Sequence, residues 1–406
     1  MDLNLRRKDV SPMSSRVIVK FGGADLATGE KVRRAAEMVL KADFKETVVV
    51  VSAMGDTTNR LIDIITQIGD ISEQDYADIV SMGERMSARV FCSALKALGA
   101  NAVYLEPSHE EWPIITNSNF KDARPDMIET CKRTQKYIEP LLSSGKIVVV
   151  CGFLGKDKNG NITTLGRGGS DTTALILANC LKADEVILVK ETSGVLSADP
   201  KIVSNPRLLN KLSIHEMFAL AHGGAKIIKA EALKYKLPDQ KLKVISFSSG
   251  DLKSQGTEIT GVFNSNSFQI KEEIGLAAIS LVCDIKPEIL SQIFATLAGN
   301  KILGISTGRD SVTIFVSPSN LKDLMNNLHR LAAIKALSCL ANVGLIEVFH
   351  PIFVDSPGWV AKITNALASK GINIIEVTTS KAAISIFIDE RKVKEAVKVV
   401  RDTLET

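Results

Sequence analysis

Apolar residues in the first part of the chain follow two alternating patterns, short unbroken runs and longer segments with an apolar stripe at helical spacing. The unbroken runs, short and β-branched enough for buried strands, are 16–21, 47–51, 147–151 and 185–189. The segments with helical spacing are 30–40, 61–68, 81–98, 121–142, 173–181 and 213–221. This alternation predicts a parallel α/β sheet, whose ligands bind outside the carboxyl ends of the strands.

The pattern changes at about residue 265, where a polar linker precedes an internal repeat. Apolar positions at 297–298, 302, 305–307 and 314–316 recur at 367–368, 372, 377–379 and 386–388. Each copy has the order strand, helix, strand, strand, helix, which is the ferredoxin-like plan. We therefore divide the chain into a basic tail (1–15, with Met13 a candidate second start), an α/β domain (16–265) and a repeat region (270–406, copies at about 275–340 and 345–406).

The glycine-rich stretch Gly160–Ala174 lies between a predicted strand and a predicted helix. Its glycines let backbone N–H groups approach an anion, and Ser170 or Asp171 can cap the helix whose positive end faces the same point. Arg167 supplies a planar fork suited to a carboxylate or a phosphate. A plain turn needs none of these polar side chains, so the stretch predicts an anion-binding site.

Other strand ends carry polar residues of the same kind. Lys20 ends a buried strand beside Gly22 and Gly23, where an ammonium group is costly unless it meets an anion. Thr58 is the expected cap of the helix at 61–68. Glu84 falls near the start of its predicted helix, where complementing the helix dipole is the alternative to a functional role.

The composition limits the classes of partner that this chain is expected to bind. The 406 residues carry a net charge of +4, are 45% hydrophobic and contain no dense basic stretch with interleaved aromatics, which argues against nucleic acid as a partner. Six scattered cysteines without a CxxC pair, and five histidines without ligand spacing, predict reduced buried thiols, no metal site and a cytoplasmic protein. No apolar run is long enough for a signal peptide or a membrane span.

Several motifs, in this order and spacing, resemble those of the aspartate kinases in the amino acid kinase family. They are VKFGG (19–23), VVVVSAMGDTTN (48–59), SMGERMSA (81–88), GFLG (152–155), TTLGRGGSDTTA (163–174), SGVLSADP (193–200) and GGAKI (223–227). The repeat region resembles the paired ACT regulatory domains of that family. The resemblance implies a three-layer α/β/α sandwich with a mostly parallel central sheet, followed by two ferredoxin-like α+β units.

The resemblance also implies a reaction. The γ-phosphoryl group of ATP is transferred to the side-chain carboxylate of L-aspartate, with Mg²⁺ held mainly through the nucleotide phosphates. The product, 4-phospho-L-aspartate, begins the biosynthesis of lysine, threonine and methionine.

The family motifs assign roles to individual residues. Lys20 neutralises the transferring phosphoryl group, the amides of Gly22 and Gly23 cradle it, and Asp171 organises the lysine. The residues implied to bind aspartate are Arg167 for its α-carboxylate, Glu84 for its ammonium group, and Thr58 and Ser170. The residues implied to hold the nucleotide are Lys190, Glu191, Leu196, Asp199 and Lys226.

The resemblance further implies regulation and assembly through the ACT units. A lysine or threonine effector is expected at the turn that contains Asp355, Ser356 and Gly358, and near Ser306 and Thr307. The alternative for the turn is a plain capped turn. Subunits are expected to pair through the ACT units into a homodimer or a higher homo-oligomer.

The sequence departs from the family pattern at several positions, and two other functions remain as alternatives. The departures are Ala24-Asp25 for Thr-Ser, Lys190-Glu191 for Thr-Asp, Leu196 for Tyr, Lys229-Ala230 for His-Pro, and Lys286-Pro287-Glu288 for a glycine-bearing effector loop. The alternatives are a kinase for another small acid such as glutamate or N-acetylglutamate, and a catalytically idle amino acid sensor. The pair Glu84 and Arg167 argues against the first, and the presence of Lys20 and Asp171 argues against the second.

Overall fold

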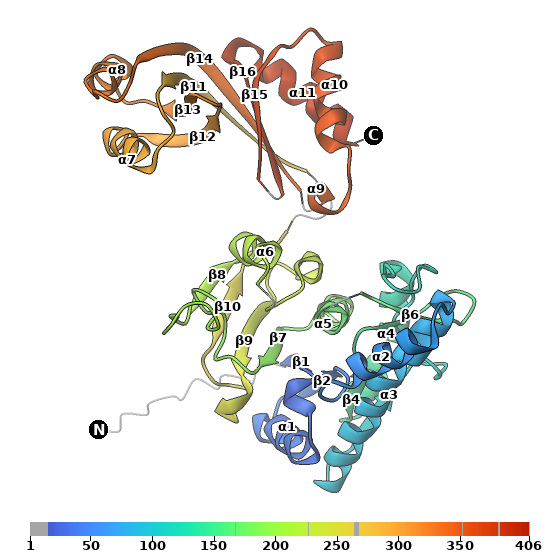
Figure 1. Cartoon of the computed structure of the whole chain (residues 1–406). Coiled ribbons are helices and arrows are strands. Elements are labelled where there is room, and N and C mark those ends of the chain that lie inside the picture. Colours follow the sequence, from blue (N-terminus) through green and yellow to red (C-terminus); the bar gives the residue numbers. More distant parts are fainter. Residues whose placement is uncertain are drawn as a thin grey trace, which may run out of the picture. The chain divides into compact units, whose positions relative to one another are not determined.

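The structure, a computed structural model, describes residues 15–405 except 167, 226, 264–267, 351 and 381, and the backbone alone at 222, 354 and 355. The chain forms two compact units, one ending at Phe263 and the other beyond it (Figure 1). We describe each unit by itself.

An eight-stranded sheet forms the middle of the first unit. Its strands are β1 (Arg16–Phe21), β2 (Glu46–Val51), β3 (Ala102–Leu105), β4 (Ile147–Cys151), β7 (Glu185–Lys190), β8 (Lys211–Ser213), β9 (Lys241–Ser246) and β10 (Thr257–Thr260). They lie in the order β3-β4-β2-β1-β7-β9-β10-β8, and every adjacent pair is parallel except β9 with β10. The predicted mostly parallel sheet is confirmed, and a small ribbon of β5 (Leu154–Lys156) and β6 (Ile162–Thr164) stands beside it.

Helices cover both faces of this sheet. They are α1 (Gly29–Ala42), α2 (Thr57–Ile68), α3 (Glu73–Ala97), α4 (Met127–Ser143), α5 (Gly169–Cys180) and α6 (Ile214–His222). Helices α4 and α5 pack against each other on one face, while α1 packs against α3 on the other, which makes three layers. Helix α5 is buried on almost every side because the sheet, α4 and a short 3₁₀ helix (Ala230–Tyr235) enclose it.

Four predicted helix starts differ from the structure, and one of them is α4, which begins at Met127 rather than at residue 121. Helix α3 begins at Glu73 rather than at residue 81, because its first turns bury Ala77 and Val80 and Ser72 caps them by accepting the Asp75 N–H. Helix α2 begins after Asp56, so Thr58 is inside its first turn and is not its cap. Helix α5 begins after Gly168, which places Ser170 and Asp171 within the first turn.

The expectation of reduced thiols throughout is wrong at one place. Cys131 of α4 and Cys180 of α5 form a disulfide, with Cα atoms 4.5 Å apart. Their separation of 49 residues gave no sequence signal, because only the packing of α4 on α5 brings them together. Cys92, Cys151 and Cys283 are free and buried, as predicted, whereas Cys339 is free but exposed, so its predicted burial is wrong.

The second unit is a six-stranded antiparallel sheet built from the two repeats. Its strands are β11 (Gln269–Val282), β12 (Lys301–Thr307), β13 (Ser311–Ser317), β14 (Ala336–Phe349), β15 (Ile374–Ser380) and β16 (Ala383–Asp389). The order β12-β13-β11-β14-β16-β15 places the first strand of each repeat, β11 and β14, side by side at the centre. The predicted repeat of strand, helix, strand, strand, helix is confirmed.

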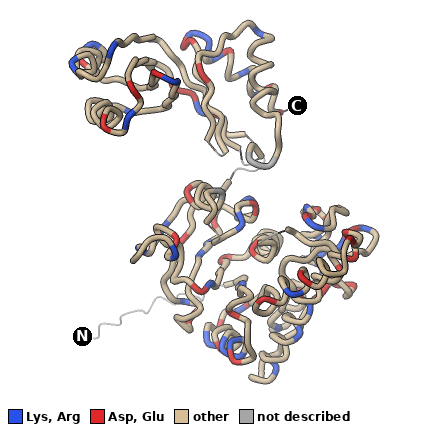
Figure 2. The backbone as a smooth tube through the Cα atoms, viewed as in Figure 1, with Lys and Arg blue, Asp and Glu red and all other residues tan. Residues whose placement is uncertain are grey.

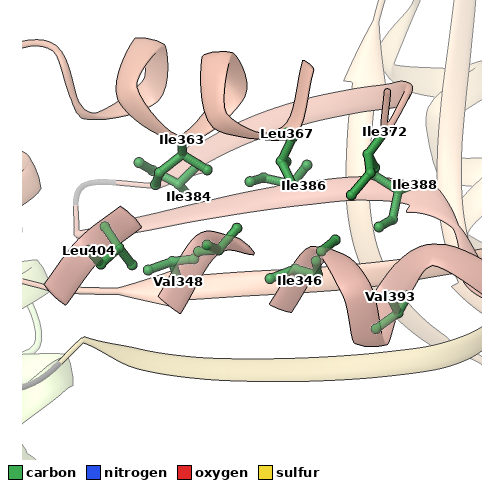
Figure 3. Packing of buried hydrophobic residues seen from close by; sticks show 12 residues of the cluster. Ile346, Val348, Ile363, Leu367, Ile372, Ile384, Ile386, Ile388, Val393 and Leu404 are labelled. Carbon is green, nitrogen blue, oxygen red and sulfur yellow. The ribbon is translucent and has the colours of Figure 1, made fainter. Parts of the chain in front are cut away.

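Each repeat buries its own core beneath its helices, which are α7 (Pro287–Thr296), α8 (Leu321–His329), α10 (Trp359–Ser369) and α11 (Val393–Glu405). A one-turn helix, α9 (Ile352–Asp355), precedes α10. Figure 3 shows how Ile346 and Ile386 of the sheet meet Leu367 of α10 in the second repeat. A third cluster joins the two repeats and contains Phe315 and Phe387, whose rings stack with centroids 3.7 Å apart.

Charged residues of both signs are interspersed along both units (Figure 2). Over the part of the chain that the structure describes, no helix is long and apolar enough to cross a membrane.

Candidate functional site

A cleft of about 920 Å³ opens in the first unit at the carboxyl ends of β1, β2 and β7. Its walls are the loops that follow these strands, the middle of α3 and the first turn of α5. This is the edge of a parallel sheet where ligands are expected to bind.

Two lysines share one buried carboxylate at the floor of the cleft. The Lys20 Nζ lies 2.8 Å from Oδ1 of Asp171, and the Lys190 Nζ lies 3.0 Å from its Oδ2. Lys20 and Asp171 are 5% and 4% exposed, so water screens their interaction little. Lys20 comes from the end of β1, Lys190 from the end of β7 and Asp171 from the start of α5, which makes the cluster a direct product of the strand order.

Burial and these partners set the charge states of the cluster. Burial alone raises the pKa of Asp171, but the ammonium groups of Lys190 and Lys20 outweigh it and hold that pKa at about 2. Burial lowers the pKa of Lys190 to about 8, with Lys20 adding to the effect and Asp171 opposing it. At pH 7 the cluster therefore holds a carboxylate and a net positive charge that suits a phosphate.

Glu84 faces the same cleft from the middle of α3 and is 4% exposed. Its Oε1 accepts the backbone N–H of Ala53 at 3.1 Å, while its buried Oε2 has no hydrogen-bond partner among the described residues. Burial raises the pKa of Glu84 to about 7, although the Ala53 N–H and Lys20 favour the charged form. A buried acceptor without a partner indicates a place for a ligand donor. The position in mid-helix excludes the helix-dipole alternative for this residue.

A second ionic cluster, centred on Glu106, anchors helix α3. Glu106, which follows β3 and is 1% exposed, accepts from Arg89 at 2.7 Å and from Arg85 at 3.3 Å, and also from the Ser108 hydroxyl. Because Arg85 is the neighbour of Glu84, this cluster holds the turn of α3 that presents Glu84 to the cleft.

Two glycines allow the loops of the cleft to approach closely. A β-carbon on Gly23 would lie 2.6 Å from the carbonyl oxygen of Ala53. Glycine is therefore needed where the loops after β1 and β2 meet. Gly168 has φ +73°, and a β-carbon there would lie 2.8 Å from the Cβ of Lys229. The Gly22 N–H donates to Oδ2 of Asp25 at 3.1 Å, so this amide already has a partner within the protein.

The predicted substrate and nucleotide residues are only partly brought together. Thr58 and Ser170 line the cleft with Lys20, Gly23, Glu84, Asp171 and Lys190. The residues lining it do not include Glu191, Leu196 or Asp199. Arg167 and Lys226 lie outside the described residues.

Sequence reasoning missed several side chains that line the cleft, among them Tyr76, Lys121 and Lys229. Lys229 donates to the carbonyl oxygen of Leu165 at 3.0 Å and lies against the glycine-rich loop. Its departure from the family pattern was the only sequence signal. Tyr76 and Lys121 lie in segments of ordinary surface composition, so the sequence carried no signal for either of them.

A second cavity, of about 590 Å³, lies in the second unit between the turn before α10 and the strands β15 and β16. Ser356 and Gly358 line it, together with Thr379 and Ser380. Ser306 and Thr307 belong to β12 and are not among its lining residues, whereas Thr379 occupies in the second repeat the position of Thr307 in the first. The side chain of Asp355 is not described.

Comparison with known proteins identifies relatives along the whole chain. Residues 15–244 match the sequence model of the amino acid kinase family, and residues 343–402 match that of the ACT domain. An aspartate kinase of Stutzerimonas stutzeri (strain A1501) is 31% identical over 96% of this chain and 97% of its own. An aspartokinase of Bacillus sp. (strain MGA3) is 32% identical with the same coverage.

The solved structures similar to this chain include aspartate kinases as well. The aspartate kinase from Synechocystis has a TM-score of 0.72 and 26% identity, covering 97% of this chain and 70% of that one. Aspartokinase III of E. coli, solved in complex with aspartate and ADP, has a TM-score of 0.56 at 22% identity, covering 96% of this chain and all of that one, and shows the shared fold.

Proposed function

The chain belongs to the amino acid kinase family and, within it, to the aspartokinases, and from this membership we propose that its cleft transfers the γ-phosphoryl group of ATP to the side-chain carboxylate of L-aspartate. The observation that carries the proposal is the cluster of Lys20, Lys190 and Asp171 on the cleft floor. Phosphoryl transfer depends mainly on positioning and charge neutralisation, and this cluster supplies preorganised positive charge.

Lys20 and Asp171 form the catalytic pair. The ammonium group of Lys20 neutralises charge on the phosphoryl group as it moves, and Asp171 keeps that ammonium group in place. The Gly23 loop approaches the same point, while the Gly22 N–H donates to Asp25.

Glu84 binds the ammonium group of aspartate. Its unpartnered Oε2 supports this role, since a charged donor there would satisfy an oxygen that is otherwise buried without a hydrogen bond. Arg167 binds the α-carboxylate, and Thr58 and Ser170 complete the substrate side of the cleft.

The nucleotide binds at the Lys190 end of the cleft. Glu191, Leu196 and Asp199, from outside the residues that line the cleft, complete its binding site together with Lys226. Mg²⁺ arrives on the phosphates. Among the described residues, no group of three or more His, Cys, Asp or Glu side chains could hold a metal ion, and Mg²⁺ commonly binds through phosphates and retained waters.

ADP release measured with a panel of acids tests the function. Aspartate should support turnover, while glutamate, N-acetylglutamate and succinate should be poor acceptors, because a site built on charged hydrogen bonds rejects analogues that leave its buried groups unpaired. Turnover with glutamate or N-acetylglutamate alone would assign the enzyme to another small acid. No turnover with any acid would favour the idle sensor.

The second unit binds an amino acid effector, lysine or threonine, and pairs subunits into a homo-oligomer. The cavity lined by Ser356, Gly358, Thr379 and Ser380 supports effector binding, because it combines backbone amides at the start of α10 with three hydroxyl side chains. If the unit only joins subunits, the effector should neither bind nor inhibit.

A further inference from the structure

We propose that Lys190 is a second cation of the phosphoryl-transfer centre, which acts together with Lys20 on the γ-phosphoryl group while it moves from ATP to its acceptor. This inference rests on the proposed function and adds a residue to its reaction. In the family pattern the position carries threonine, so this role belongs to this chain.

Lys190 lines the cleft, whereas the segment that follows it in the sequence does not. Its ammonium group contacts both oxygens of Asp171, at 3.2 Å and 3.0 Å, while Glu191, Leu196 and Asp199 are not among the residues that line the cleft. Lys190 is the last residue of β7, and β7 pairs in parallel with β1, which ends in the segment that carries Lys20. Adjacent strands therefore deliver two ammonium groups to one carboxylate.

Charge balance favours a ligand at this point. Two ammonium groups against one carboxylate leave a buried positive charge, and a buried charge is costly unless it is paired. The remaining nearby carboxylates are Glu84, Asp25 and Glu191. Burial raises the pKa of Glu84 and of Asp25, and each keeps one buried oxygen without a partner among the described residues, while Glu191 is exposed. A bound phosphate supplies the missing negative charge.

The step itself needs no proton transfer. A carboxylate oxygen of the acceptor forms a new bond to the γ-phosphorus, and the bond from that phosphorus to the β,γ-bridging oxygen breaks. Its electron pair stays on ADP. Negative charge therefore moves across the equatorial oxygens and onto the bridging oxygen, where two ammonium groups held by Asp171 stabilise it without reorganisation.

Turnover of the full-length protein should distinguish this role from a structural ion pair. Lys190→Met is expected to lower kcat by about 10-fold to 100-fold, less than the hundredfold or more typical of losing a preorganised donor because Lys20 remains, whereas Lys190→Arg should recover a large part of it. The matched control is Lys243→Met. Lys243 has the same 19% side-chain exposure and pairs with Glu185 of β7 at 3.1 Å, but it does not line the cleft, so its kcat should not change.

The pH dependence of turnover distinguishes a catalytic Lys190 from a structural one, because losing a merely structural ion pair would not change that dependence. With a pKa of about 8, Lys190 loses its proton above that pH, so kcat/KM for ATP should fall there in the wild type. The charged groups that face it are Asp171, Lys20, Asp25 and Glu191. The fall should be absent in Lys190→Met and should move to higher pH in Lys190→Arg.

Binding measurements place the charge along the phosphate chain. Lys190→Met should weaken binding of a non-hydrolysable ATP analogue more than binding of ADP, because its ammonium group faces the γ-phosphoryl group. An equal loss for both would place Lys190 on the nucleoside side and overturn the proposal.

A folded Lys190→Met protein with wild-type kcat and an unchanged pH profile would reduce Lys190 to a structural ion pair. If that variant does not fold, the wild-type profile and Lys190→Arg still decide the question. Failure of the proposed function is a separate result, since it would appear as a wild-type protein that releases no ADP with aspartate.

Discussion

At the scale of single residues, three buried carboxylates in and near the cleft differ in pKa because their partners differ. Asp171 has two ammonium groups and a pKa of about 2. Glu84 has one backbone N–H and the weaker influence of Lys20, and its pKa is about 7. Asp25, which accepts only from Gly22, also has a raised pKa. The cleft therefore combines a permanent anion, Asp171, with Glu84, whose charge depends on pH and ligands.

Replacing Lys20 by alanine should lower turnover by at least about a hundredfold, because one preorganised charge is removed from the reacting phosphoryl group. The protein should stay folded, since Asp171 keeps Lys190 as its partner. Steady-state ADP release and a thermal melt check the two parts of the prediction. Near-normal turnover in the folded variant would remove Lys20 from the catalytic role.

The pKa of Glu84 predicts how substrate use depends on pH. Only the charged carboxylate can pair with the ammonium group of aspartate, and roughly a tenth of it is charged one pH unit below its pKa. We expect kcat/KM for aspartate to fall as the pH drops below about 7. Glu84→Gln should raise KM and abolish this limb, whereas the surface variant Glu37→Gln, on α1, should keep it. A limb that persists in Glu84→Gln would assign it to another group.

At the scale of elements, the disulfide between Cys131 and Cys180 ties α4 to the end of the helix whose first turn carries Asp171. The disulfide closes a loop of 49 residues, and closing a loop of that length restricts the unfolded chain and stabilises a protein by about 4 kcal/mol. Cys131→Ser should lower the free energy of unfolding of the first unit by that order, while Cys339→Ser, in the second unit, should not. Urea denaturation followed by the fluorescence of Trp112, in a Trp359→Phe background, measures it. Free thiols at both positions in the untreated protein would contradict the bridge.

The sequence predicted the elements better than their ends. Unbroken apolar runs identified β1, β2, β4 and β7, because a strand buried on both faces needs little else. The start of α3 was missed because its first two turns are largely acidic and bury few side chains, among them Ala77 and Val80. The motifs selected Lys20, Glu84 and Asp171 as site residues, and all three line the cleft. The contact of Lys190 with Asp171 depends on β7 lying beside β1, which no local pattern records.

At the scale of the whole molecule, the second unit should make the enzyme responsive to an amino acid. An effector acts only through different affinities for two arrangements, with coupling of about 1 to 3 kcal/mol. Deleting residues 270–406 should therefore abolish inhibition by lysine or threonine. Thr379→Val should weaken inhibition without changing uninhibited turnover, while Thr307→Val, its counterpart in the first repeat, serves as the matched control.

Titration of lysine, threonine and methionine against activity, with calorimetry alongside, measures both variants. Weakened inhibition in Thr307→Val alone would move the effector site to the first repeat. Absence of both binding and inhibition for all three amino acids would leave the second unit with a role in assembly.

The central pairing of β11 with β14 also has a consequence for synthesis on the ribosome. Gln269 pairs with Phe349 and Val282 with Ala336, so β11 stays without this neighbour until the chain beyond residue 336 has emerged. At typical elongation speeds this delay is on the order of several seconds. During that time a nascent first repeat exposes the edge of β11 that β14 will cover, and such an open edge is a template for aggregation. The pairing of the two repeats therefore makes the newly made protein dependent on β14, or on a chaperone that covers the free edge of β11 until β14 is made.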